Sequence, residues 1–306
     1  MRLFGMFLQA IQSVDNGQRL AISCLGSARE SLDFMIQVFD SLIKEVDKSL
    51  AQNFIESVVS LISSHNCISS LLSLGRGGLL LLHKLMRLIG MVVSCPNSAF
   101  LVSSNSNIRA GIVHLCFDQL YSALSGRTTV GESNSALLDL REMHYQLMHK
   151  ILSSRWNWFF KPINREFESE EGNKFFVKAM EIYFSSFQDM TLPPSTYGYN
   201  LSVFNDLQKV HKLYSVQLFK TEMLPAFTET LLTAMMDGSR QILHDELVLT
   251  VFGLASADFN LFFGQIVPRF VSKYSNPQAT IPNFATSTDF PSFSRNLKFF
   301  INDIKV

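Results

Sequence analysis

Residues Phe252–Phe270 read FGLASADFNLFFGQIVPRF, and the spacing of their apolar side chains decides the fold class. Ser256 and Asp258 come early in the stretch and carry side-chain oxygens that can cap the first turn of a helix. The apolar side chains that follow fall at the i, i+3, i+4, i+7 rhythm of one helix face: Phe259, Phe262, Phe263, Ile266 and Phe270. Because such a face must be buried on a neighbour, the stretch predicts a capped helix in a packed helical protein.

Apolar stripes with helical spacing recur along nearly the whole chain, and no strand-like alternation competes over a comparable length. They indicate roughly eleven or twelve helices, a density typical of helical hairpins that repeat every 40 to 47 residues or so. The sequence therefore predicts an all-α fold, an α-solenoid of HEAT-like antiparallel helical hairpins. The stripes are Leu32, Ile36, Phe39, Ile43 and Val46; Phe54, Val58, Leu61 and Ile62; Leu79–Val93; Val113, Phe117, Leu120 and Leu124; Leu137, Leu140, Leu147 and Ile151; Phe175, Phe176, Ala179, Ile182 and Tyr183; Val203, Leu207, Val210 and Tyr214; Leu224, Phe227, Leu231 and Met235; Ile242–Leu254; Asp258–Lys273; and Phe293, Leu297, Phe300 and Ile304.

Caps and loop-forming residues divide these stripes. Ser27 and Glu30 form a capping box that predicts a helix start, and Ser49 and Gln52 repeat the device. Segments rich in Gly, Pro, Ser or Thr predict loops near 125–135, 191–200 and 275–291, and the second, with its two prolines, is the clearest linker. We expect one HEAT-like segment over residues 1–306, interrupted only by these loops.

Composition indicates a folded protein without a strong charge preference. Of the 306 residues, 47% are hydrophobic and only 17% are charged, which is far from the composition of disordered chains. Lys plus Arg and Asp plus Glu both total 26, so no overall field attracts nucleic acid or an anionic membrane. The cysteines lack the spacing of a zinc site, and we expect them to be reduced and buried: Cys24, Cys67, Cys95 and Cys116.

Two apolar segments raise the question of targeting or membrane insertion. Met1–Ile11 is interrupted by Gln9 and lacks a small-residue cleavage site, so we do not expect a signal peptide. The run Leu79–Val93 is short for a membrane span and contains three potential cations: His83, Lys84 and Arg87. We expect a buried helix there and no membrane insertion.

Motifs that could carry chemistry have simpler structural interpretations. Gly75-Arg76-Gly77-Gly78 lacks the preceding strand and the following Lys-Ser/Thr of a phosphate-binding loop, and is better explained as a helix-breaking turn. His144 and His149 lie five residues apart, so they do not share a face, and we expect two surface or edge histidines. No catalytic signature is present, so we predict no enzyme, no catalytic residues, no metal and no cofactor.

Two short motifs resemble processing signals. His244-Asp245-Glu246-Leu247 matches an endoplasmic-reticulum retention signal, but that signal is read only at a C-terminus. Asn200-Leu201-Ser202 fits a glycosylation sequon, and we expect a helix cap after the Pro193 linker instead.

The aromatic segment Arg155-Trp156-Asn157-Trp158-Phe159-Phe160-Lys161 allows two interpretations. Trp and Arg are over-represented in protein-binding hot spots. Consecutive aromatic side chains cannot all face outward on a helix, however, so we favour a packed helix end that joins two repeats.

Three segments together resemble the C-terminal part of the exportin-six branch of the β-karyopherins, the importin-β superfamily of nuclear transport receptors. They are Arg155–Lys161, Ala255–Phe263 (ASADFNLFF) and Asp289–Asn296 (DFPSFSRN), in that order. The intervening helices fit in order and spacing, so the resemblance covers Ala136–Val306, whereas residues before about 130 show only compatible helical patterning.

This resemblance implies a HEAT-repeat receptor that carries profilin-bound actin out of the nucleus together with Ran-GTP. It also implies contacts with nuclear pore proteins and shuttling between nucleus and cytoplasm. Members of the family are much longer than 306 residues, so we expect a fragment from the C-terminal third of such a receptor. The alternatives are a HEAT-type adaptor in a cytosolic assembly without transport activity, and an all-helical enzyme, which would need a deep pocket with converging polar groups.

Overall fold

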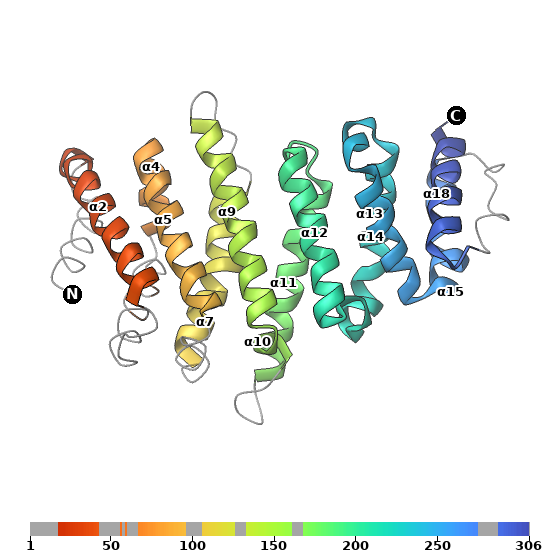
Figure 1. Ribbon diagram of the computed structural model, residues 1–306, viewed down its shortest axis with the longest axis horizontal. Coiled ribbons are helices and arrows are strands. Elements are labelled where there is room, and N and C mark those ends of the chain that lie inside the picture. Colours follow the sequence, from red (N-terminus) through yellow and green to blue (C-terminus); the bar gives the residue numbers. More distant parts are fainter. Residues whose placement is uncertain are drawn as a thin grey trace. The chain divides into compact units, whose positions relative to one another are not determined.

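The computed structural model describes residues 18–42, 56, 59, 67–95, 106–125, 133–160, 168–274 and 287–305. Every regular element in these ranges is a helix and none is a strand, which confirms the predicted all-α class for this part of the chain. The chain divides into two compact units, Met1–Ala179 and Met180–Val306, and Figure 1 labels most of their helices. The prediction of a single segment over residues 1–306 stays a prediction.

The first unit consists of paired helices. Its central helix α5 packs on α2, α4 and α9, and α9 also packs on the helix formed by α7, η2 and α8. Helix α11 crosses the boundary between the units. The elements are α2 (Gln18–Leu42), α4 (Cys67–Ser73), α5 (Gly75–Ser94), α7 (Ser106–His114), the π-helical turn η2 (Leu115–Leu120), α8 (Tyr121–Leu124), α9 (Ser133–Ser154), α10 (Asn157–Phe160) and α11 (Glu168–Gln188).

The glycine-rich turn between α4 and α5 allows these two helices to approach closely. Gly75 has a φ of 63°, a left-handed conformation that glycine adopts without steric cost. A Cβ atom on Gly78 would lie 1.8 Å from the carbonyl oxygen of Leu71 on α4. The predicted break between two helices is therefore confirmed, but it lies at Leu74, and all four residues of the motif Gly75–Gly78 belong to the first turn of α5.

Helix α9 is antiparallel to the α7–η2–α8 helix. The Arg141 guanidinium, early in α9, donates to the carbonyl oxygen of Leu124 at the end of α8 over 3.0 Å. Arg109, near the start of α7, donates to the carbonyl oxygen of Trp158, just beyond α9, over 2.8 Å. The predicted stripes of both helices are buried between them, which confirms this hairpin: Val113, Phe117, Leu120 and Leu124; Leu137, Leu140, Leu147 and Ile151.

The second unit continues the paired arrangement. Helix α14 packs on α12, α13 and α18. Asp245, early in α14, contacts Lys298 at the middle of α18, and Phe252, farther along α14, contacts Phe290 at the start of α18, so these two helices are antiparallel. The elements are α12 (Pro194–His211), η3 (Leu213–Ser215), the π-helical turn η4 (Phe219–Met223), α13 (Leu224–Met236), η5 (Gly238–Leu243), α14 (His244–Ala257), α15 (Phe259–Leu261), the π-helical turn η6 (Phe262–Ile266), α16 (Val267–Lys273) and α18 (Phe290–Lys305).

An aromatic cluster around Phe204 forms the core of the second unit. The Phe204 ring stacks on Phe227 of α13 with centroids 4.9 Å apart. It also meets Phe187 of α11 edge-on at 5.7 Å, and Phe219 of η4 at the same distance. Offset and edge-on ring pairs of this kind add stability beyond the area they bury. Helices α11, α12 and α13, together with η4, thus share one core.

Several predicted helix boundaries were wrong. Ser27 does not start a helix, because α2 begins at Gln18 and runs through it. The predicted linker at 191–200 is helical from Pro194 onward, since proline at the first helical position has no N–H to satisfy and a fixed φ that suits a helix. For the same reason α18 begins at Phe290, with Pro291 inside its first turn.

Two predicted stripes extended too far. Val210 is 67% exposed, because α12 ends one residue later, at His211, where Lys212 turns the chain with a φ of 56°. Ile242 is 80% exposed, because it lies in the short helix η5 and not in α14.

Several predictions fall outside the described residues. They concern Met1–Ile11, the capping box Ser49–Gln52, the end of the first stripe (Ile43 and Val46), the stripe Phe54, Val58, Leu61 and Ile62, and most of the loops near 125–135 and 275–291. The side chains of Phe39, Cys24 and Cys67 are also outside the description.

Candidate protein-interaction surface

The phenylalanine-rich stretch spans the end of one helix and the start of the next, as the separate stripes Ile242–Leu254 and Asp258–Lys273 predict. Helix α14 ends at Ala257, and the helix that starts at Phe259 leaves it at an angle of 107°. Asp258 lies at the bend, and its carboxylate accepts a hydrogen bond from the backbone N–H of Leu261 over 3.0 Å. The predicted cap at Asp258 is therefore confirmed, whereas the Ser256 hydroxyl donates back into α14, to the carbonyl oxygen of Phe252.

The capping carboxylate also ties this bend to the preceding helical pair. Lys220 of η4 lies 3.1 Å from Asp258. The hydrogen bond from Leu261 and the nearby Lys220 ammonium both hold the pKa of Asp258 below its usual range. The group is thus ionised at neutral pH and stabilises both the helix start and the contact with η4.

Most of the phenylalanine stripe is core. Phe262, Ile266 and Phe270 are buried, and the Phe262 ring lies 5.6 Å from Phe293 of α18. Phe259 and Phe263 are half-buried and stack on each other at 5.9 Å. The stripe therefore joins neighbouring helices, and little of it is available to a partner.

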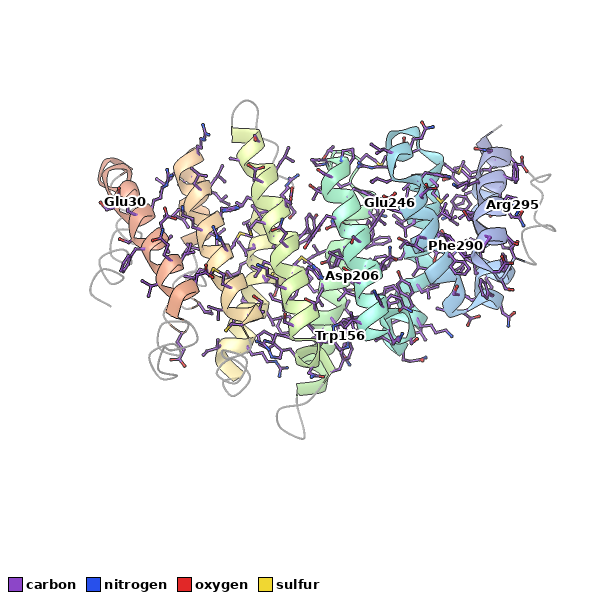
Figure 2. All side chains as sticks on the ribbon, in the orientation of Figure 1. Glu30, Trp156, Asp206, Glu246, Phe290 and Arg295 are labelled. Atoms are coloured by element: carbon purple, nitrogen blue, oxygen red, sulfur yellow. The ribbon has the colours of Figure 1, made fainter. Side chains whose placement is uncertain are left out.

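The Trp156 segment is also packed, as predicted. Trp158 and Phe159 are buried, and Phe159 meets Phe117 edge-on at 6.0 Å. Trp156 and Phe160 are half-buried against Phe176 of α11, at 5.9 and 5.0 Å. Figure 2 labels Trp156 among the side chains of this helix end.

Arg155 takes part in the same packing. Its guanidinium donates to the carbonyl oxygen of Cys95 over 3.2 Å, and partial burial lowers its pKa. The structure confirms a packed helix end for this segment, and Lys161 lies outside the described residues.

His144 is not the surface histidine that the sequence predicted. It is buried between α9 and η2, where its Nε2–H donates to the carbonyl oxygen of Cys116 over 2.7 Å. Burial lowers the pKa of His144 to about 4, so the ring is neutral at physiological pH. His149 is half-buried, in agreement with an edge position.

The remaining motifs have structural roles. Asn200 is buried inside α12 and donates to the hydroxyl of Ser186 over 3.0 Å, so the predicted helix cap was wrong. Its burial also makes the amide inaccessible to a glycosylating enzyme. Within the internal His244–Leu247 sequence, Asp245 pairs with Lys298 over 2.8 Å.

Cys95 and Cys116 are the two cysteines whose side chains the structure describes, and neither of them forms a disulfide. Cys116 is buried, which raises the pKa of its thiol, and Cys95 is half-buried. Within the described ranges, no group of three or more His, Cys, Asp or Glu side chains is placed to hold a metal ion.

Helix α5 is long and apolar enough to cross a membrane, and the bent pair Arg240–Ala257 and Phe259–Lys273 passes the same test if counted as one span. However, 61% of the most apolar window of α5 is buried inside the protein. Core helices of this kind meet the length and composition criteria without crossing a membrane.

A buried carboxylate links α13 and α16 in the second unit. Glu229 of α13 forms ion pairs with Arg269 and Lys273, and both basic side chains are more than half exposed. One acid thus holds two cations, which leaves an excess of positive charge on the exposed side of α16.

The exposed large apolar side chains of the second unit include two that lie in neighbouring turns. Met190 lies between α11 and α12 and is 45% exposed, and Ile242 lies between α13 and α14. Arg240 joins these turns by hydrogen bonds to backbone carbonyl oxygens of the first turn. Sequence reasoning missed this arrangement, because exposure depends on which turns meet and no local spacing encodes it.

The arrangement contains buried helix interfaces and an exposed turn surface, which together suit protein binding. A family model described as "Exportin-6, C-terminal TPR repeats" matches residues 152–306. The match confirms the resemblance over the C-terminal half, and it describes the helical pairs as TPR repeats, whereas we predicted HEAT-like hairpins.

Relatives match more of the chain than the sequence analysis suggested. Exportin-6-B of Xenopus laevis is 26% identical over 90% of the chain, and Exportin-6 of Homo sapiens is 24% identical over the same share. Exportin-6 of Danio rerio is 25% identical over 100% of the chain, so the similarity includes the residues before about 130.

The chain spans about a quarter of the length of these relatives, between 24% and 26%. No solved structure matches the chain. The family match over half of the sequence and the helical pairs in both units lead to one conclusion: the chain belongs to the exportin-6 family.

Proposed function

We propose that this chain is part of a nuclear export receptor that carries protein cargo out of the nucleus. The observation that carries the proposal is the exportin-6 family match to residues 152–306, supported by relatives that align with 90% or more of the chain. The cargo, by analogy, is actin bound to profilin, and Ran-GTP is the second partner. Such a receptor acts in both nucleus and cytoplasm and contacts nuclear pore proteins on its way.

The physical basis of the proposal is the packed helical scaffold of the residues that the structure describes. Its buried polar side chains make structural hydrogen bonds, as His144 does with Cys116 and Asn200 with Ser186. We infer that the protein is a receptor and not an enzyme, has no cofactor and does not insert into a membrane. We also infer that both units belong to one repeat array of a longer protein.

The proposed mechanism is positive coupling between cargo and Ran-GTP. In such a scheme each ligand binds more tightly when the other is present, and GTP hydrolysis releases both. Helices that pack through aromatic rings, as Phe204 does on Phe227, can shift slightly while remaining in contact. This property would let a repeat array change curvature between its loaded and empty states.

A binding experiment tests the proposal. A full-length protein that contains this chain is applied to immobilised profilin–actin and to immobilised Ran-GTP, with Ran-GDP as the control. We expect retention on the first two surfaces only. Failure to bind either ligand would reject the export function, and steady cytoplasmic residence when nuclear export is blocked would favour a cytosolic adaptor.

A further inference from the structure

Two turns at one end of the second unit present apolar side chains to solvent. Met190 lies in the turn between α11 and α12, and Ile242 lies in the turn between α13 and α14. Ile242 is 80% exposed, the largest value among the large apolar side chains of the described residues. We call this surface the turn edge and define it by Met190, Asp237, Ile242 and Glu246.

Arg240 fixes the two turns to each other. Its guanidinium donates to the carbonyl oxygen of Leu192 over 2.9 Å and to that of Asp189 over 3.1 Å. The same group lies over the Tyr197 ring, 4.5 Å from its centroid, and is almost fully buried. A buried cation held by three groups keeps the two turns in one arrangement, so Met190 and Ile242 are exposed on turns whose relative position is fixed.

Acidic side chains border this apolar pair. Asp237 and Glu246 are both exposed, and Figure 2 labels Glu246 in the first turn of α14. Two nearby basic groups do not offset this acidic charge, because Arg240 is buried and Lys298 pairs with Asp245. The outward charge of the turn edge is therefore negative.

The other end of α12 has the opposite character. Val210 is exposed there to a similar extent, but its exposed neighbours include Lys209 and Lys212. Val210 is thus an exposed apolar position of the same unit with lysines beside it in sequence, which provides an internal control.

We propose that the turn edge docks a basic segment of a protein partner through apolar anchor side chains. Exposed apolar groups on a rigid surface are the usual anchors of protein interfaces, and charge of opposite sign at the rim speeds association and selects the partner. A segment with Lys or Arg on either side of leucine-type residues meets both requirements. The inference does not depend on the proposed export function, since it concerns this surface alone.

The test uses the whole chain and a defined probe. The probe is a short fluorescein-labelled peptide with leucines on one helix face and Lys and Arg elsewhere, and its fluorescence anisotropy reports binding. A second peptide, with Glu in place of Lys and Arg, is the charge control. We expect the basic probe to bind, with an affinity that falls as salt concentration rises.

Variants of exposed residues locate the binding site. We expect Met190→Ser combined with Ile242→Ser to weaken probe binding about tenfold, and Glu246→Arg to weaken it several-fold. Val210→Ser is the matched control and should leave the affinity unchanged. If circular dichroism shows that the double variant has lost helical structure, the single variant Ile242→Ser replaces it in the binding assay, because the Ile242 side chain makes little contact with the core.

Three results would overturn the proposal. They are absence of binding by the basic probe, equal binding by the acidic probe, and equal weakening by Val210→Ser and the turn-edge variants. These outcomes are independent of Ran and profilin–actin. Failure of the turn-edge proposal would therefore not reject the export function, which is tested by the binding experiment with profilin–actin and Ran-GTP.

Discussion

Replacement of Phe262 by alanine should destabilise the second unit strongly. The Phe262 side chain is fully buried, and its ring lies 5.0 Å from Phe263 and 5.6 Å from Phe293 of α18. Removal of a buried ring from such a core costs about 3 to 5 kcal/mol, because burial is lost and a cavity remains. Phe263→Ala should cost roughly half as much, since Phe263 is only half-buried.

The assay is urea denaturation followed by circular dichroism, combined with hydrogen exchange of the α18 amides. Both tryptophans of the chain, Trp156 and Trp158, lie in the unit Met1–Ala179, so their fluorescence reports on that unit separately. Phe299→Ala is the matched control, because Phe299 is on α18 and is 61% exposed. Its effect should stay within about 0.5 kcal/mol.

The result that would refute this reasoning is simple. If Phe262→Ala destabilised the protein no more than Phe299→Ala, the ring at 262 would face solvent. The phenylalanine stripe would then be a binding surface, and the assignment of its side chains to the core would be wrong.

Three further predictions follow from other parts of the two units. Arg240→Ala should lower the free energy of unfolding by about 2 to 4 kcal/mol, because two charge-assisted hydrogen bonds and the contact with Tyr197 are lost. In urea denaturation, Arg240→Lys should retain less than half of the stability that Arg240 contributes, since an ammonium lacks the planar, forked donor geometry of a guanidinium. The free energy of unfolding should fall by about 3 kcal/mol as the pH is lowered from about 6.5 to 4, because burial lowers the pKa of His144 to about 4 and this histidine is protonated in the unfolded chain before it is protonated in the folded one. Denaturation curves of His144→Gln should lack this pH dependence. Gly78→Ala should lower the melting temperature, because the new Cβ would meet the carbonyl oxygen of Leu71. Gly26 lies inside α2 with open space around it, so Gly26→Ala should raise stability by about 0.5 to 1 kcal/mol. Equal effects of the two changes would contradict the close approach of α4 and α5.

Helix identity and core composition were predictable where a stripe fills one uninterrupted helix. All four stripe residues of α13 are buried, as are those of α18: Leu224, Phe227, Leu231 and Met235; Phe293, Leu297, Phe300 and Ile304. The periodicity works there because one face alone meets the core, so burial follows the 3.6-residue repeat directly.

Interruptions of the helices were not predictable from periodicity. The prolines at 193 and 194 indicate a turn and also suit a helix start, so the sequence alone does not distinguish these outcomes. The apolar spacing after Asp258 is that of a regular α-helix, whereas the structure inserts the π-helical turn η6 at Phe262–Ile266. A π turn is a response to packing against neighbouring helices and leaves no spacing signal in advance.

The turn edge was missed for a different physical reason. Arg240 is separated from its backbone partners by 48 and 51 residues along the chain, and carbonyl oxygens exist at every position. No residue type therefore marks the site that holds this arginine. Ile242 was assigned to a buried stripe, because an exposed isoleucine and a buried one look the same in sequence.

The measurement that tests the central claim most directly is the affinity of a full-length protein containing this chain for profilin–actin, with and without Ran-GTP. Positive coupling predicts that saturating Ran-GTP tightens the binding of profilin–actin by roughly 5- to 150-fold, and that Ran-GDP has no effect. The same dissociation constant in all three conditions would contradict the export-receptor account.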